Sequence, residues 1–123
     1  MIEKLLIVDD HAPTRQWLQS ILSPVAREIR QSSDGSEAVK TFEEQRPDWV
    51  VMDIEMKPMD GLTAARIIKG RFPEARIVIM TNHQEASLRP AALQAGAVHF
   101  LLKEDLWQVR GIIEAQSTTQ PLH

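Results

Sequence analysis

The sequence of 123 residues contains no cysteine, which excludes disulfide bonds and thiolate metal sites and fits a reducing compartment. No apolar run approaches the roughly 20 residues that a membrane-spanning helix needs, so we expect no membrane contact. Basic charge is also scarce, because 14 Lys and Arg stand against 17 Asp and Glu. The net charge of −3 therefore provides no broad basic surface for direct nucleic-acid binding. What remains is the composition of an ordinary globular domain.

Short apolar runs alternate with amphipathic segments along the chain. There are five such runs. The weakest, at residues 26–32, alternates between apolar and polar residues, which is typical of a strand at a sheet edge. Apart from Arg76 and His99, the four stronger runs are continuously apolar, as expected for parallel strands that helices cover on both faces. They are residues 5–8, 49–52, 76–80 and 98–102.

Helical signals follow each of the five runs. Asp34, Asp60 and Asp105 are candidate N-caps, and Gly96 is a candidate helix stop. The tryptophans, Trp17, Trp49 and Trp107, are expected to pack within helices or strands.

Five such strand-helix units predict an α/β fold: a doubly wound, five-stranded parallel sheet with strand order 2-1-3-4-5 and five flanking helices, similar to flavodoxin. We expect one domain over residues 1–116, followed by a polar C-terminal tail or linker start over residues 117–123.

Three carboxylates are expected to meet at the edge of this sheet. Asp9 and Asp10 follow the first strand and Asp53 ends the third, and these two strand ends flank the point where the strand order reverses. Two unit charges ~4 Å apart at an effective dielectric of ~20 repel by about 4 kcal/mol, which is large against a domain stability of ~5–15 kcal/mol. The cluster therefore predicts a bound cation, and carboxylates without His or Cys partners suit Mg²⁺.

Two further strand ends add complementary groups. Thr81 follows the fourth strand and offers a hydroxyl donor, and Lys103 follows the fifth and offers an ammonium group. A carboxylate, a divalent metal, a hydroxyl and a lysine suit phosphoryl transfer, with Asp53 held rigidly as the nucleophile.

The segments "LLIVDDH", "VVMDIEMKPMDG", "IVIMTN" and "AGAVHFLLKEDL" carry a resemblance to a known family. In this order they resemble the receiver domain of two-component response regulators, both chemotaxis regulators and transcriptional regulators, over essentially the whole chain. The resemblance implies a cytoplasmic, phosphorylation-dependent signalling switch that receives its phosphoryl group from a histidine kinase or phosphotransfer protein. It further implies control of an effector protein or an attached output domain, and it allows homodimerisation on phosphorylation.

The resemblance also implies roles for individual residues. Asp53 would accept the phosphoryl group and, with Asp10 and the backbone carbonyl of Glu55, hold Mg²⁺ or Mn²⁺, whereas Asp9 would act through water. Lys103 would pair with the phosphoryl group.

The switch residues follow from the same resemblance. Thr81 would hydrogen-bond the phosphoryl group on activation, and Phe100 would turn inward as the threonine moves. This motion would change the face built from the fourth helix, the fifth strand and the fifth helix.

Three residues are expected to tune water access to the site: Glu55, Asn82 and His83. Asn82 stands where the family usually has a small residue, and Glu104 stands where it usually has a proline. Pro90 interrupts the fourth helical segment and predicts a shortened or mobile switch helix, because an internal proline costs ~3 kcal/mol outside the first turn.

Other functions fit the sequence less well. An aspartyl-phosphate phosphotransferase or phosphatase would need a substrate-binding insertion, and a flavodoxin-like binding module would need a Ser/Thr/Gly-rich loop where this chain has "DDHAPT". We therefore expect no enzyme with external turnover. The alternative that stays open is a receiver-like module that works unphosphorylated through protein contacts.

Overall fold

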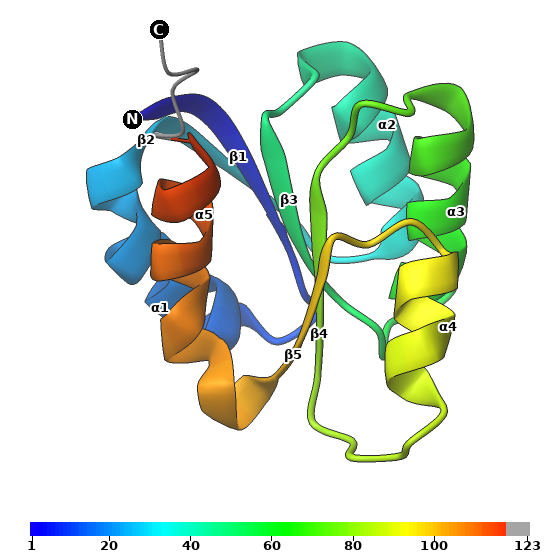
Figure 1. Ribbon diagram of the computed structural model, residues 1–123. Coiled ribbons are helices and arrows are strands. Elements are labelled where there is room, and N and C mark those ends of the chain that lie inside the picture. Colours follow the sequence, from blue (N-terminus) through cyan, green and yellow to red (C-terminus); the bar gives the residue numbers. More distant parts are fainter. Residues whose placement is uncertain (118–123) are drawn as a thin grey trace, which may run out of the picture.

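Five parallel strands form the middle layer of the structure, which the computed structural model describes for residues 1–117 (Figure 1). Their spatial order is β2-β1-β3-β4-β5, as predicted, and β2 lies at an edge as its alternating pattern indicated. Every neighbouring pair is parallel, so the carboxyl ends of all the strands lie along one edge of the sheet. The strands are β1 (Ile2–Val8), β2 (Ala26–Ser32), β3 (Trp49–Asp53), β4 (Ile77–Thr81) and β5 (His99–Leu102).

Helices cover both faces of the sheet (Figure 1). One face carries α1 (Ala12–Leu22) and α5 (Val109–Ser117). The opposite face carries α2 (Gly35–Gln45), α3 (Gly61–Arg71) and α4 (Leu88–Gln94). Two short 3-10 helices complete the described chain, η1 (Ser23–Val25) and η2 (Lys103–Gln108). Within residues 1–117, no helix has the length and apolar character needed to cross a bilayer.

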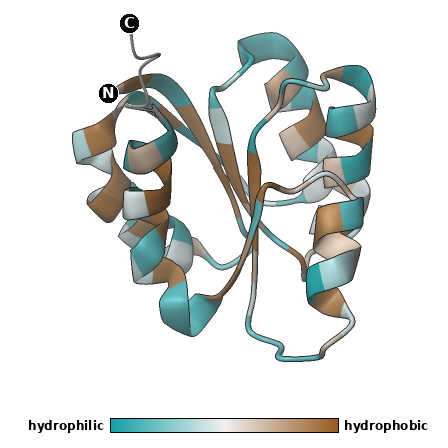
Figure 2. Cartoon of the chain, viewed as in Figure 1, coloured by the Kyte–Doolittle hydropathy of each residue, from teal (hydrophilic) through white to brown (hydrophobic). Residues whose placement is uncertain are grey.

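The core consists of two apolar clusters, one on each side of the sheet. Successive residues of a strand point to opposite faces, so Leu6 and Val8 of β1 join the α2–α4 side whereas Leu5 and Ile7 join the α1–α5 side. Figure 2 shows brown along the middle of the sheet and a mixture of teal, white and brown on the helices around it. All residues of β3 and β4 are buried, which leaves the ends of these strands little freedom to move.

The predicted helix boundaries hold where capping chemistry is clear. The carboxylate of Asp34 accepts a hydrogen bond from the Glu37 backbone N–H at 2.9 Å, and Asp60 accepts one from Thr63 at 2.8 Å. Gly96 follows α4 with a φ of 105°, a left-handed conformation that glycine adopts without strain.

Two expectations about the last helix were wrong or incomplete. Asp105 does not cap α5, because the chain leaves β5 directly through η2 and the α-helix begins only at Val109. This tighter turn buries Leu106 immediately after the strand. Ser117 belongs to α5, and the rest of the predicted tail, residues 118–123, lies outside the described residues.

Helix α4 is short, which is one of the two outcomes that Pro90 predicted. α4 begins at Leu88, so that Pro90 is its third residue, and it spans 7 residues against 11 in α3. A proline costs little there because the first N–H groups of a helix lack intrahelical acceptors.

The tryptophan prediction holds for one residue of three. Trp49 is fully buried in β3, but Trp17 is 44% exposed and Trp107 is 67% exposed. Trp17 lies one residue before the buried Leu18, which rotates it about 100° around α1 and away from the core stripe.

Candidate functional site

Three carboxylates meet at the carboxyl edge of the sheet, as predicted. Asp9 follows β1 directly, Asp10 comes next, and Asp53 is the last residue of β3. One carboxylate oxygen from each lies within 4.8 Å of the other two. Asp9 and Asp53 are buried and Asp10 is exposed, so the cluster extends from the core to the surface.

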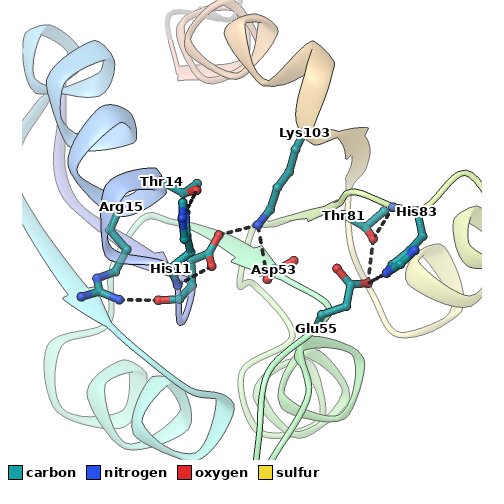
Figure 3. A network of polar contacts seen from close by, with 9 residues as sticks. His11, Thr14, Arg15, Asp53, Glu55, Thr81, His83 and Lys103 are labelled. Carbon is teal, nitrogen blue, oxygen red and sulfur yellow. Dashed lines mark hydrogen bonds and ion pairs between the residues drawn. The ribbon is translucent and has the colours of Figure 1, made fainter.

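Lys103 supplies positive charge to this cluster (Figure 3). Its Nζ atom lies 2.8 Å from Asp9 Oδ2 and 3.4 Å from Asp53 Oδ2. The other oxygen of Asp9 accepts the backbone N–H of His11 at 2.9 Å. Burial alone would lower the pKa of Lys103, but the bond to Asp9 and the charge of Asp53 outweigh it and hold that pKa above its ordinary value. Lys103 is therefore a cation at neutral pH.

The ionised form of Asp53 is unfavourable in this cluster. Burial first, and then the negative charge of Asp9, raise the pKa of Asp53 from 3.8 to about 7, although Lys103 opposes the shift. Its Oδ1 atom is buried and has no hydrogen-bond partner among residues 1–117. A buried carboxylate oxygen without a partner is unfavourable, so this atom is suited to receive an external group.

The donor set fits a hard divalent cation. All three cluster side chains offer carboxylate oxygens, and these are the ligands that Mg²⁺ prefers over nitrogen or sulfur. Both oxygens of Asp9 already have partners, whereas Asp10 is exposed and Asp53 Oδ1 is unpaired. The cluster is therefore consistent with Mg²⁺ binding on the side of Asp10 and Asp53.

Thr81 and Glu55 form a second polar group beside the acids (Figure 3). Thr81 ends β4 and is fully buried, and its hydroxyl donates to Glu55 Oε2 at 2.7 Å. The Thr81 oxygen accepts the backbone N–H of His83 at 3.1 Å, and His83 Nε2 lies 3.9 Å from Glu55 Oε2. The charge of Glu55 also contributes to the raised pKa of Asp53.

A hollow of about 730 Å³ opens over the cluster. Its floor contains Asp53 and Lys103, and the predicted tuning residues Glu55, Asn82 and His83 all line it. The wall nearest α1 and η2 includes apolar and aromatic side chains, namely Pro13, Trp17 and Leu106.

Phe100 lies apart from this hollow. Its side chain is buried on the α4 side of β5, and the guanidinium of Arg89 lies 5.1 Å from the centre of its ring. In the sheet, Phe100 is paired in register with Ile79, two residues before Thr81. Phe100 and Thr81 therefore lie diagonally across two neighbouring strands, and the switch role of Phe100 stays a prediction.

Two residues that support the site were not identified from the sequence. A Cβ atom at Gly61 would lie 2.0 Å from the Asp53 carbonyl oxygen, so only glycine allows α3 to begin this close to β3. The Arg15 guanidinium donates from Nη1 to the carbonyl oxygen of Asp9 at 2.6 Å and ties α1 to the acidic loop. The glycine directly after the Asp60 cap could have indicated a close approach of the backbone, whereas no sequence pattern indicated a role for Arg15.

The sequence matches the response regulator receiver domain over residues 5–113. Chemotaxis protein CheY of Bacillus subtilis is 37% identical over 120 residues, covering 97% of this chain and 98% of that protein. Transcriptional regulatory protein DegU of Brevibacillus brevis is 32% identical, with 82% of this chain matching 44% of that protein.

Solved structures agree with these sequence matches. A CheX-CheY-BeF3-Mg²⁺ complex from Borrelia burgdorferi contains a chain with a TM-score of 0.86 and 29% identity, covering 95% of this chain and 90% of that one. The strand order, the acidic cluster and the match over nearly the whole length lead to one assignment. This chain belongs to the response regulator receiver domain family, the phosphorylation-dependent signalling switches of two-component systems.

Proposed function

We propose that Asp53 is the phosphoacceptor of this receiver domain. An ionised Asp53 oxygen would attack the phosphorus of a phosphohistidine on a histidine kinase or phosphotransfer protein. A P–O bond forms while the P–N bond breaks, and the electron pair leaves with the imidazole nitrogen of the donor. The observation that carries the proposal is Asp53 Oδ1, which is buried and unpaired beneath an open hollow while its sister oxygen faces Lys103.

The neighbouring groups would stabilise the transferred phosphoryl group. Lys103 would turn its ammonium group from Asp53 to a phosphoryl oxygen while keeping its 2.8 Å contact with Asp9. A Mg²⁺ or Mn²⁺ ion held by Asp10, Asp53 and the Glu55 backbone carbonyl, with Asp9 through water, would neutralise further phosphoryl charge. Both autophosphorylation and dephosphorylation would be catalysed by the domain itself, without turnover of an external substrate.

Phosphorylation of Asp53 would change which partner protein the domain binds. The donor protein would approach through the hollow, and the signal would leave by the face of α4, β5 and α5, with Thr81 and Phe100 as the switch residues. Residues 1–117 would be the receiver unit, since Ser117 belongs to α5, and residues 118–123 would be the start of a tail or linker. The kinase and the effector protein or output domain would act with it in the cytoplasm.

The test is incubation with acetyl phosphate and Mg²⁺ followed by intact mass measurement. We expect one phosphate-sized adduct on the wild-type chain and on Glu44→Gln, an exposed acid outside the cluster, and none on Asp53→Asn. An adduct that persists in Asp53→Asn would assign the acceptor elsewhere. A wild-type chain that never forms one would favour the receiver-like module that works unphosphorylated. Light scattering with and without beryllofluoride, a phosphoryl mimic, would then show whether modification produces a homodimer.

A further inference from the structure

The hydroxyl proton of Thr81 is held by the side chain of Glu55. The Thr81 oxygen lies 2.7 Å from Glu55 Oε2, which is the usual length of a hydrogen bond from a hydroxyl to a carboxylate. The two residues come from different segments, since Thr81 ends β4 and Glu55 lies two residues beyond the end of β3. Their contact therefore links two of the loops that surround Asp53 (Figure 3).

A threonine hydroxyl has only one proton to donate. In this structure the Thr81 oxygen also accepts the backbone N–H of His83 at 3.1 Å, which directs its proton away from that amide and toward Glu55. Thr81 is fully buried, so water cannot provide a substitute acceptor. An anionic oxygen bound on Asp53 can receive this proton only if Glu55 gives it up.

We propose that Glu55 is a positioning residue that competes with the phosphoryl group for the Thr81 hydroxyl, so that switching is an exchange of this one hydrogen bond. The proposal rests on the proposed function of Asp53. The Glu55 side chain is 37% exposed, and water can solvate its carboxylate after the exchange, which keeps the step reversible. Glu55 thereby stabilises the resting state and raises the threshold for activation.

The expected change in affinity for a phosphoryl mimic follows from the hydrogen bond that each state loses when Glu55 is truncated. In Glu55→Ala the resting Thr81 donor becomes buried and unpaired, whereas in the phosphoryl-bound state it keeps its new acceptor. Hydrogen bonds to charged groups are strong enough that this difference should tighten the binding of a phosphoryl mimic about tenfold. Removing the negative charge of Glu55 also strengthens anion binding, but that effect does not depend on the Thr81 hydroxyl.

A double-mutant cycle separates the two effects. The Kd of beryllofluoride in saturating Mg²⁺ would be measured by ¹⁹F NMR titration for the wild type, Glu55→Ala, Thr81→Val and the double variant. We expect the tightening caused by Glu55→Ala to be about tenfold larger in the Thr81 protein than in the Thr81→Val background. Equal tightening in both backgrounds would overturn the proposal and leave only the charge effect of Glu55.

Conservative variants provide the rescue that a merely structural role would not show. Glu55→Gln keeps an oxygen acceptor without charge, and Thr81→Ser keeps the hydroxyl, so both should retain most of the coupling. They also preserve a test if Thr81→Val does not fold, because Glu55→Gln removes only the charge whereas Glu55→Ala removes the charge and the acceptor of the Thr81 hydroxyl. Glu55→Ala should therefore tighten beryllofluoride binding more than Glu55→Gln does, and equal tightening by both would overturn the proposal. A wild-type chain that binds no beryllofluoride would overturn the proposed function itself, and this inference with it.

Discussion

Asp53→Asn should stabilise the metal-free chain, although it removes a residue from the centre of the site. Burial and the charge of Asp9 make the ionised form of Asp53 unfavourable in the folded chain, which is why its pKa rises from 3.8 to about 7. Asparagine occupies nearly the same volume and carries no charge. Lys103 keeps its 2.8 Å partner Asp9 in the variant, so the substitution leaves one lysine paired with one buried carboxylate.

The expected magnitude depends on pH. Between pH 3.8 and about 7 the folded wild type binds a proton at Asp53 that the unfolded chain has released, so the free energy of unfolding falls as pH rises through this window. The loss amounts to up to about 4 kcal/mol and is complete above pH 7, since each pKa unit corresponds to about 1.4 kcal/mol. We expect Asp53→Asn to restore about 2–4 kcal/mol of this lost free energy of unfolding at pH 8. That corresponds to a rise of roughly 8–16 °C in Tm for a domain of this size.

Thermal and urea unfolding in excess EDTA at pH 8 and at pH 4.5 would check this prediction. At pH 4.5 the folded wild type is already protonated at Asp53, so the advantage of the variant should disappear. Glu44→Gln, which removes an exposed charge outside the cluster, is the control for net charge and should change little. Saturating Mg²⁺ should raise the Tm of the wild type more than that of the variant. A variant that melts at or below the wild type at pH 8 without metal would refute the claim that the acids destabilise one another.

Three further substitutions test the supports of the site by urea unfolding. Gly61→Ala should lower the free energy of unfolding by at least about 2 kcal/mol, because the new Cβ atom would lie 2.0 Å from the Asp53 carbonyl oxygen. The control is Gly70→Ala in the same helix, whose Cβ atom meets nothing within 4 Å and should raise the free energy of unfolding by up to about 1 kcal/mol. Equal effects of the two substitutions would refute the close approach. Lys103→Met should lower the free energy of unfolding by about 3–5 kcal/mol in EDTA at pH 8, because Asp9 and Asp53 remain buried without their cation. An unchanged free energy of unfolding would contradict the ion pairs. Asp34→Ala removes the N-cap of α2 and should lower the free energy of unfolding by about 1 kcal/mol. The affinity for beryllofluoride should stay the same, and a changed affinity would show that the cap acts on the site.

Much of the fold could be predicted because its strands have an unambiguous pattern. A continuously apolar run such as residues 49–52 can be satisfied only where helices cover both faces of a sheet, and the structure places both core clusters against it. The start of α5 could not be predicted in the same way. The six residues of η2 bury only Leu106, and one apolar position is too few for the sequence pattern to distinguish a 3-10 turn from an α-helical turn.

The positions of the acids and of Lys103 were predictable for a geometric reason, since the carboxyl ends of parallel strands share one edge. The contacts made by loop side chains were not. The sequence suggested that the Glu55 backbone holds a metal and that its side chain tunes water access, but the bond from Thr81 to this side chain depends on the path of the chain after β3. The contact of Arg15 with the Asp9 carbonyl likewise depends on how α1 lies against β1, and no local pattern encodes that distance.

The burial of β3 explains why an apolar strand carries a single carboxylate at its end. A carboxylate on a mobile loop would relieve its repulsion by turning toward water, and its pKa would stay near the ordinary value. Asp53 cannot turn away, because every residue of β3 is buried and Gly61 places the start of α3 directly against the Asp53 carbonyl. The folded chain therefore keeps an unpaired oxygen and an excess of negative charge at one point. Binding a cation would relieve the charge, and the proposed phosphoryl group on the unpaired oxygen would give the Thr81 hydroxyl a second acceptor. Through the rigid strand, these two local events would become a free-energy difference between two states of the domain.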